Sequence, residues 1–596
     1  MKRLLIFSHF NQQELLSSYV VFILEKLRPF FARVVFVSNS NLDKEVKRRL
    51  LPFTDKILER ENIGFDFGAW KQAILEEGWE NIETYDSLTI MNDTCFGPFF
   101  EMKEVFDKME NSNVDFWGLT NHKALNFGMP GSEGPVPEHI QSYFLSFDKK
   151  IIVSEVFTKF WNSVQNFTDV NKIILHYETQ LTTVFKKSGF TCKVYCDTNS
   201  LNYDFVNFTS LRPDYFIENN CPFIKVKGFF QFDSPVYLKQ LVKKLKYYDF
   251  KLIEDHFNQT YIPNISLRVT DKVFITNQSK KLSGFGTLKV AIHFHVTCVD
   301  LFEKYLSDLV NVSNRPDVYI TTDSEEKKSL ISHRIKSQPI TFIVKEIFVH
   351  EGIGSNYNHW LKISDDLKKY DLVGHFQTIN EDSRFYTKHF LSSEELYDTL
   401  LRPTDEIIEL FENEPVLGIL ISDIPKSLTR MIDKKTWNES KDRFSILWKK
   451  MECKKIINTS LIVSPVIPYG SMFWYRPVAI KPLIDQEIIK DEFDREAHSE
   501  VDSIESTLGS LLVYVAWDQG YDFKIALSRN YISSGFDQNL LTDLKMKQEA
   551  LIRSTTWKMG LLVTWLPKKL SSLLNSIKKQ NLFNLFNDTF SNRINF

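Results

Sequence analysis

The same order of secondary structure is predicted at two places in this chain, and this repetition restricts the possible folds more than any other feature. A short apolar strand (3–10), a helix (14–27) and a second apolar strand (32–40) open the N-terminal half. The second half opens in the same way, with a strand over 288–296, a helix over 298–310 and a strand over 316–324. Strands that alternate with helices indicate an α/β fold.

Further segments match between the two halves in the same order along the chain. The matched pairs are 85–94 with 370–378, 115–120 with 416–422, 141–152 with 470–480, and the Glu-x-x-Leu helices that contain Glu178 and Glu505. A shared order favours duplication of one α/β domain over coincidence. Because 596 residues exceed what one core holds, we expect two related domains, 1–285 and 286–540, followed by a tail, 541–596.

The tail carries a charge that the average conceals. Nine basic and two acidic residues from Lys545 onward give residues 545–596 a charge of +7, which leaves −10 for the rest of a chain whose net charge is −3. This balance argues against nucleic acid as a partner. Leucines at helical spacing between lysines (568–579) predict an amphipathic helix on an anionic membrane surface. A helical hairpin packed on the protein body is the alternative.

Compartment signals point to the cytosol. The apolar run at 4–7 is shorter than the roughly 7–15 residues of a secretory signal, and no stretch reaches the roughly 18 apolar residues of a membrane span. The six cysteines are sparse, and only Cys192 and Cys196 lie close together, without further ligands nearby. We therefore expect reduced cysteines in a cytosolic enzyme.

The segment 61–70 (ENIGFDFGAW) is the most informative stretch of the N-terminal half. Gly64 and Gly68 permit tight turns and close approach of a ligand to the backbone. Asp66 offers a carboxylate for ribose hydroxyls or a base N–H, and Asn62 can bond backbone or base edges. The alternative is a glycine-capped loop in which Asp66 is the N-cap of the following helix.

Two further carboxylates suit the chemistry of sugar transfer. Asp93 follows Asn92 at the end of an apolar strand, where it could hold Mg²⁺ or Mn²⁺ against a diphosphate; a turn Asp is the alternative. Glu178 is the candidate base, because inverting transfer from a nucleotide sugar needs a carboxylate that takes the proton of the acceptor hydroxyl. A solvated helical Glu is the alternative.

Three residues are candidates for contacts with the acceptor. Trp117 could stack on a sugar face, although a core position is equally compatible with the sequence. His176 lies two residues before Glu178, and Gln141 lies in the segment HIQSYFLSF.

The order NIGFDFGAW, MNDTCFGPF, DFWGLT, HIQSYFLSF, HYETQLT resembles the rhamnan synthesis protein F family, glycosyltransferases of bacterial rhamnose cell-wall polysaccharides. The resemblance implies the GT-A fold of nucleotide-diphospho-sugar transferases. It also implies a donor-binding loop at 62–70, a metal and diphosphate edge at Asn92 and Asp93, and Glu178 as the base. The implied donor is dTDP-L-rhamnose, and the implied acceptor is a lipid-linked rhamnan at the inner membrane face.

The second half departs from the family pattern. Gly354-Ser355-Asn356 stands where Gly-Arg-Asp is expected, 375–378 (HFQT) replaces Lys-x-His-Thr, and 502–504 (DSI) replaces Asp-Gly-Thr. These losses of charge favour a degenerate domain that holds the acceptor chain. A second transferase that uses Glu505 and Asp502 is the alternative.

The sequence therefore predicts an α/β protein with two tandem GT-A-like domains and an amphipathic tail. We expect an inverting rhamnosyltransferase of the hexosyltransferase class, cytoplasmic and peripheral on the inner face of the plasma membrane. A non-catalytic polysaccharide-binding or scaffold protein of the same pathway is the competing hypothesis.

Overall fold

The computed structural model describes residues 1–529, with gaps in that range that are listed at the end of this paragraph. The predicted tail, 541–596, lies outside the described residues. Asp502 also lies outside them, and the first residues of the helix that contains Glu505 are described in their backbone alone. The gaps are 127–134, 204–206, 277–286, 310–311, 314, 338–341, 351–355, 379–392, 423–433, 463–464 and 486–503.

The N-terminal half forms one mixed sheet in the order β3-β2-β1-β4-β8-β6-β7, with β9 also paired to β6. Neighbouring strands are parallel from β3 to β4, β8 runs antiparallel to β4 and β6, and β9 is parallel to β6. The carboxyl ends of β1, β4, β6 and β9 therefore share one edge of the sheet. The strands are β1 (Arg3–His9), β2 (Arg33–Ser38), β3 (Lys56–Glu59), β4 (Ser87–Asn92), β6 (Phe116–His122), β7 (His139–Ile140), β8 (Phe144–Asp148) and β9 (Cys192–Cys196).

The second half forms a sheet in the order β11-β18-β16-β17-β15-β12-β13-β14. From β14 to β18 this order repeats the first sheet from β3 to β9, including one antiparallel strand, β17, at the place of β8. The segments matched in the sequence supply equivalent strands: β4 and β15, β6 and β16, β8 and β17. The strands are β11 (Val273–Thr276), β12 (Val290–Val296), β13 (Asp317–Thr322), β14 (Ile343–Val349), β15 (Leu372–Gln377), β16 (Leu417–Ser422), β17 (Phe473–Tyr475) and β18 (Asp522–Ser528). Strand β11 lies before the boundary predicted near residue 285 and already belongs to the second sheet.

Helices cover both faces of the N-terminal sheet. Successive side chains of a strand point to opposite faces, so its buried apolar residues need a covering layer on each side. Leu5 and Phe7 of β1 point into one core, whereas Leu4 and Ile6 point into another. The first core is closed by α1 (Ser18–Leu27), α5 (Met102–Glu110), α13 (Pro235–Lys243) and α14 (Lys251–Thr260). The second is closed by α3 (Phe65–Glu77), α7 (Glu155–Ser163) and α9 (Thr179–Lys187).

Helix α1 is shorter than the predicted 14–27. Glu14 has a left-handed backbone (φ 56°), and the N-cap Ser17 is extended, so the helix begins at Ser18. Leu16 and Ser17 are nevertheless buried. Residues both before and after the first residue of the helix therefore pack into the core.

The second sheet is also layered, with its main helices distributed between two cores. One core contains residues of α16 (Val299–Leu309), α17 (Glu325–Ser337), α20 (Ser393–Leu400) and α21 (Thr404–Asn413). The other contains residues of α18 (Asn356–Lys362), α22 (Lys434–Lys450), α23 (Lys481–Ile484) and α25 (Ile504–Asp518).

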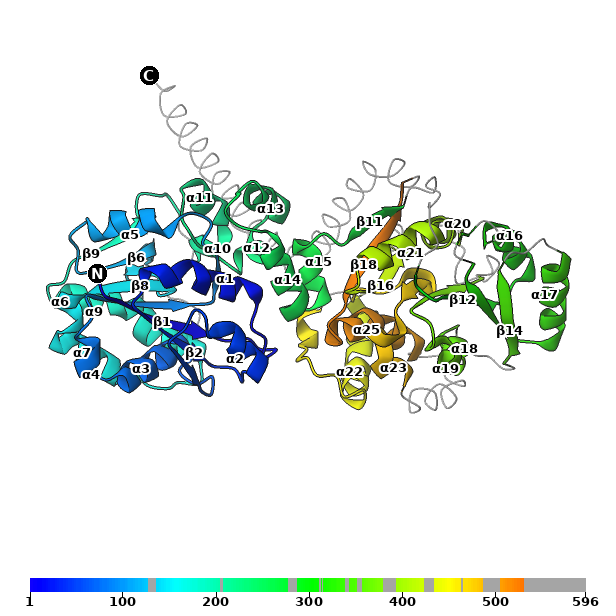
Figure 1. Cartoon of the computed structure of the whole chain (residues 1–596), viewed down its shortest axis with the longest axis horizontal. Coiled ribbons are helices and arrows are strands. Elements are labelled where there is room, and N and C mark those ends of the chain that lie inside the picture. Colours follow the sequence, from blue (N-terminus) through cyan, green and yellow to red (C-terminus); the bar gives the residue numbers. More distant parts are fainter. Residues whose placement is uncertain are drawn as a thin grey trace, which may run out of the picture.

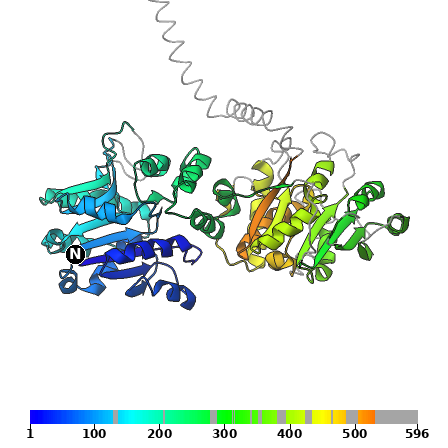
Figure 2. The same cartoon turned by 45° about the horizontal axis from the view of Figure 1, so that its top comes forward.

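The two sheets lie side by side, with α14 and α15 (Pro263–Val269) between them (Figures 1 and 2). Ile262, just before α15, packs into a core of the second half, and the Tyr514 hydroxyl donates to Asn264. Gln13 exchanges two hydrogen bonds with the backbone of Ile456, at 2.9 and 2.8 Å. In the described part of the chain, no helix combines the length and the apolar character needed to cross a membrane.

Candidate functional site

The N-terminal sheet brings Asp66, Asn92, Asp93 and Glu178 to the edge where β1, β4 and β6 end. Ligands of open α/β sheets bind at the carboxyl edge of the strands. Asn92 is the last residue of β4, and Asp66 lies in the first turn of α3. Residues predicted separately from three motifs are thus neighbours in the fold.

The loop before α3 is shaped by its glycines. Gly64 is the N-cap of α3 with φ 69°, and a Cβ there would lie 2.5 Å from the Asn166 side-chain oxygen. A Cβ on Gly68 would lie 2.8 Å from the carbonyl oxygen of Ile63. The alternative in which Asp66 caps the helix is therefore wrong: Gly64 occupies the cap position, which leaves the Asp66 carboxylate available to other partners.

Asp66 joins three elements of the site. Its Oδ1 accepts from the Ser8 hydroxyl of β1 at 3.2 Å, and its Oδ2 accepts from the Asn92 amide of β4 at 2.7 Å. Burial raises the pKa of Asp66, although these two hydrogen bonds oppose the shift, as does the charge of Lys225. Asn92 therefore acts as a bridge that orients Asp66.

Asp93 is a nearly buried carboxyl group with little positive charge around it. Its side chain is 11% exposed, and its Oδ2 accepts from the backbone N–H of Phe10 at 3.0 Å. Burial, reinforced by the charge of Asp66, raises the pKa of Asp93 to about 8. His9 lies 4.0 Å away, but burial lowers its pKa to about 4, so the ring is neutral at pH 7.

These two carboxyl groups fit a divalent cation. Mg²⁺ binds hard oxygen ligands, and in phosphate sites it commonly takes one or two carboxylates together with phosphate oxygens and waters. Within the described ranges, no group of three or more His, Cys, Asp or Glu converges on one point. Asp66 and Asp93 could supply the one or two carboxylates that such a site takes from the protein, and phosphate oxygens and waters would be its other ligands.

Asn62 is engaged with the protein at the start of this loop. Its side-chain oxygen accepts from the Asn39 amide, just beyond β2, at 3.1 Å. Asn39 in turn accepts from Arg60 at 3.0 Å. Hydrogen bonds therefore hold the segment predicted to bind the donor beside Asp66, and the Asn62 side chain takes part in these bonds.

Glu178 lies in a π-helical turn, Ile174–Glu178, between α8 (Val170–Ile173) and α9. Its Oε1 accepts from the backbone N–H of Ser142 at 3.3 Å, and its charge acts on Asp66 and His122. Short π-helical turns are rare and occur frequently at functional sites. The sequence gives no signal for this turn, which sets the direction of the predicted base.

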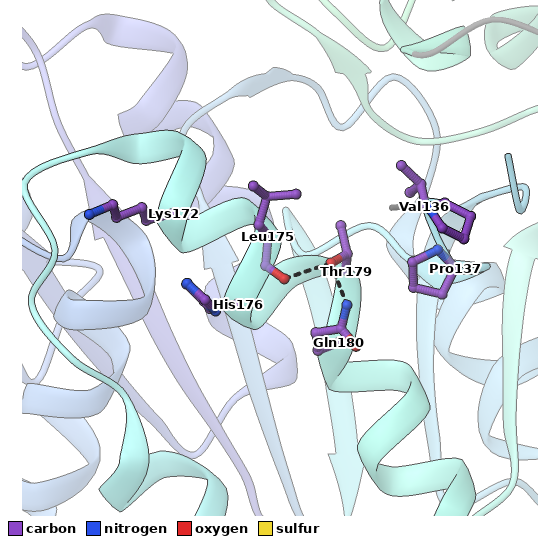
Figure 3. A pocket seen from close by; sticks show the side chains of 8 residues that line it. Val136, Pro137, Lys172, Leu175, His176, Thr179 and Gln180 are labelled. Carbon is purple, nitrogen blue, oxygen red and sulfur yellow. Dashed lines mark hydrogen bonds between the residues drawn. The ribbon is translucent and has the colours of Figure 1, made fainter. Parts of the chain in front are cut away.

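The three acceptor candidates differ in their surroundings. Trp117 is 5% exposed and packs with Phe106 and Phe144, at ring distances of 5.7 and 5.5 Å, so it takes the core position left open by the sequence. Gln141 is buried and accepts from the Thr120 hydroxyl at 2.8 Å. His176 is exposed and lines a cavity of about 370 Å³, whose walls also include Pro137, Leu175 and Thr179 (Figure 3).

The equivalent edge of the second sheet has a different chemistry. Gln377 and Thr378 stand at the places of Asn92 and Asp93, and Thr378 accepts from the backbone N–H groups of Thr297 and Cys298. A group of histidines lies close by, which the sequence did not single out. His293 and His375 meet at 2.8 Å through their Nδ1 atoms, and His295 stacks on His359 at 4.2 Å.

Neutral buried histidines make the stability of the second half depend on pH. Burial holds the pKa of His375 and of His293 well below the usual value, and it lowers that of His295 to about 3. The unfolded chain takes up these protons below about pH 6.5, whereas the folded chain does not. Stability must therefore fall as pH drops below about 6.5.

Replacing His375 by phenylalanine should reduce this pH dependence. The Phe ring suits the aromatic neighbours Trp360 and Phe473, and His293 keeps its contact with Thr321. Between pH 7.5 and 5.0 we expect the wild type to lose about 2 kcal/mol more unfolding free energy than H375F, measured by urea denaturation. Equal losses would contradict the assignment, and H333F, at an exposed position of α17, is the control.

Comparison with known proteins places most of the chain in one family. The family described as "Rhamnan synthesis protein F" matches residues 34–521. The uncharacterized protein y4gN of Sinorhizobium fredii is 29% identical over 188 residues, which are 31% of this chain and 47% of that protein. Virulence protein VirA of Vibrio anguillarum is 29% identical over 161 residues, 26% of this chain and 47% of its own. The chain spans about half the length of the curated relatives it matches.

Solved structures with partial similarity include nucleotidyl- and glycosyltransferases. The 4-diphosphocytidyl-2C-methyl-D-erythritol synthase of Anaerococcus prevotii is 14% identical and covers 40% of this chain and 98% of its own, with a TM-score of 0.22. The glycosyltransferase GlyE of Streptococcus pneumoniae is 11% identical. The match covers 65% of this chain and 88% of that chain, with a TM-score of 0.21. TM-scores of this size do not establish a shared fold.

Proposed function

The chain belongs to the rhamnan synthesis protein F family, and on this premise we propose that it is a polysaccharide glycosyltransferase. The proposed reaction moves L-rhamnose from dTDP-L-rhamnose to a lipid-linked rhamnan acceptor, with inversion. The observation that carries the proposal is the meeting of Asp66, Asp93 and Glu178 at the carboxyl edge of the N-terminal sheet. Glycosyl transfer needs a base and a site for the leaving diphosphate, and these carboxyl groups suit the two tasks.

In the proposed step, Glu178 takes the proton of an acceptor hydroxyl as its oxygen attacks the anomeric carbon. A new C–O bond forms on one face while the bond to the diphosphate breaks on the other, and the diphosphate leaves with the bonding electrons. A β-linked donor thus gives an α-linked rhamnose, and Glu178 ends protonated. The bond from Ser142 N–H orients the carboxylate before the acceptor arrives.

Asp66 and Asp93 would hold a divalent cation, Mg²⁺ or Mn²⁺, whose charge stabilises a leaving diphosphate. Ser8 and Asn92 keep Asp66 in place, and the Phe10 N–H keeps Asp93 in place. Lys225, whose charge acts on Asp66, adds a positive group to the same edge. The sequence did not single out this lysine.

The second half is assigned the binding of the acceptor chain, without catalysis of its own. This assignment is supported by the replacement of Asn92 and Asp93 by Gln377 and Thr378 at the equivalent edge. Attachment to the inner face of the plasma membrane through the basic tail, which lies outside the described residues, belongs to the same proposal.

Incubation of the full chain with dTDP-L-rhamnose, Mg²⁺ and a synthetic lipid-linked rhamnose acceptor tests the proposal. We expect a mass increase by whole rhamnose units and an α-linkage in the product. Calorimetry with dTDP addresses the competing hypothesis, a non-catalytic scaffold. An unmodified acceptor together with no saturable heat would contradict the transferase and support the scaffold.

A further inference from the structure

Lys225 lies at the carboxyl edge of the N-terminal sheet, although the chain reaches this place long after the predicted motifs. It is the last residue of β10 (Ile224–Lys225), which pairs antiparallel with β5 (Cys95–Phe96). Strand β5 starts directly after Thr94, and the backbone N–H of Val226 donates to the carbonyl oxygen of Thr94 at 2.9 Å. This pairing fixes the backbone of Lys225 beside the end of β4.

A chain of hydrogen bonds connects the Lys225 ammonium group with the Asp66 carboxyl group. The Nζ atom of Lys225 donates to the Thr94 hydroxyl at 3.2 Å, and this hydroxyl donates to the Asn92 side-chain oxygen at 2.7 Å. The Asn92 amide in turn donates to Asp66 at 2.7 Å. One end of the chain is thus a positive group, and the other end is a carboxyl group that we assign to the cation.

The Lys225 side chain is held in this direction and is open to solvent. Its Nζ atom lies over the Tyr143 ring, 4.4 Å from the ring centre. Tyr143 is buried and its hydroxyl accepts from Thr120 at 2.9 Å, so the ring is a fixed surface. Lys225 is only partly buried, and its hydrogen bond to the exposed Thr94 lies at the protein surface. A ligand at the sheet edge can therefore reach the ammonium group.

The charge of Lys225 is not neutralised by an ion pair. In the described part of the chain, no Asp or Glu oxygen lies within 4.0 Å of its Nζ atom. An ammonium group has three N–H donors, and the Thr94 hydroxyl takes one of them. Lysine is a common ligand of phosphate groups, which it binds as a point charge. An anion with several oxygens, such as a diphosphate, fits the donors that are left.

We propose that Lys225 donates directly to an oxygen of the donor's diphosphate, next to the cation assigned to Asp66 and Asp93. The inference rests on the proposed function and adds a protein ligand to its diphosphate site. Negative charge on the diphosphate grows as its bond to the sugar breaks. Lys225 therefore stabilises the transition state more than the bound donor, and it contributes both to donor affinity and to the rate of transfer.

Replacing Lys225 by methionine tests this assignment. Methionine keeps an unbranched apolar side chain against the Tyr143 ring but removes the charge and the donors. We expect K225M to bind dTDP at least tenfold more weakly than wild type, in Mg²⁺ and in excess EDTA alike, because the ammonium group acts on the diphosphate and not on the cation. K225R restores a positive donor and should bind dTDP within about threefold of wild type.

Lys2→Met is the matched control, because Lys2 has the same kinds of partner at the opposite end of the sheet. Its Nζ atom donates to the Thr84 hydroxyl at 2.8 Å and lies 4.4 Å from the centre of the Tyr85 ring. These residues come just before β1 and β4 begin. K2M should bind dTDP within about twofold of wild type.

Binding of inorganic pyrophosphate separates failure of the inference from failure of the proposed function. Titrated calorimetrically into the full chain with Mg²⁺, pyrophosphate presents the diphosphate without a nucleoside or a sugar. If the wild type binds pyrophosphate and K225M binds it at least tenfold more weakly, the inference holds even when no rhamnose is transferred. Equal binding by wild type and K225M, or no binding to the wild type, would overturn it.

Discussion

Replacement of Glu178 by glutamine is expected to lower the rate of sugar transfer by about 10³-fold, because the acceptor hydroxyl loses its proton acceptor. The substitution keeps the shape of the side chain, and the amide oxygen can still accept from the Ser142 N–H. The π-helical turn that directs residue 178 is therefore preserved. Initial rates of transfer from dTDP-L-rhamnose, measured together with calorimetric binding of dTDP, check this expectation.

Glu138→Gln is the matched control for this variant. Glu138 lies close to β7 near the same edge, is exposed and accepts from the Asn199 amide at 2.9 Å. We expect E138Q to transfer sugar within about twofold of wild type. Transfer by E178Q at a rate near that of wild type would reject Glu178 as the base, and loss of dTDP binding in E178Q would indicate a disturbed site.

The fold could be predicted from the sequence where local patterns coincide with long-range pairing. The apolar segments 85–94 and 370–378 form central strands, β4 and β15, which are parallel to β1 and β12, respectively. Strands that are buried on both faces need apolar residues along their length, so the equivalent strands of the two halves remain similar in sequence. Strand β11 could not be assigned in the same way, because its sheet membership depends on pairing with β18, about 250 residues later.

The candidate site was predictable in its residue types and much less in its contacts. Asp93 could be chosen as a carboxylate after a strand and Glu178 as a carboxylate on a matched helix, whereas Asp66 was predicted as a nucleoside ligand from its glycine-containing loop. The bridge from Asn92 to Asp66 joins α3 to β4, and no spacing in the sequence encodes it. The stacking of His122 on His139 could not be predicted either, because stacking and burial are properties of the folded state.

The two sheets share their order but differ at the edge where ligands bind. The N-terminal edge gathers two carboxyl groups whose pKa values are raised mainly by burial and further by a neighbouring carboxylate, since Glu178 acts on Asp66 and Asp66 acts on Asp93. Burial of such groups without a cation costs stability. The equivalent positions of the second edge are occupied by neutral side chains that hydrogen-bond to the backbone. Carboxyl groups with raised pKa values at the N-terminal edge, and neutral hydrogen-bonded side chains at the second edge, favour chemistry in the N-terminal half alone.

Asp93→Asn is expected to weaken dTDP binding in the presence of Mg²⁺ at least tenfold, or about 1.4 kcal/mol. The asparagine oxygen can still accept from the Phe10 N–H, so the loop keeps its anchor while the site loses a carboxyl group that can ionise against a bound cation. A site with one carboxylate fewer holds the cation more weakly, so less cation is present to bind the diphosphate. In excess EDTA, where no divalent cation is available, wild type and D93N should bind dTDP with equal affinity.

The matched control is Asp197→Asn at the neighbouring end of β9, where Asp197 accepts from Asn121 and from the backbone N–H of Asn199. D197N should retain the difference in dTDP affinity between Mg²⁺ and EDTA. Asp66→Asn should lose that difference as D93N does, since Asp66 raises the pKa of Asp93 and shares its edge. If D93N and D66N both keep the full effect of Mg²⁺, these carboxylates do not hold the cation, and the leaving diphosphate must be stabilised by protein donors such as Lys225.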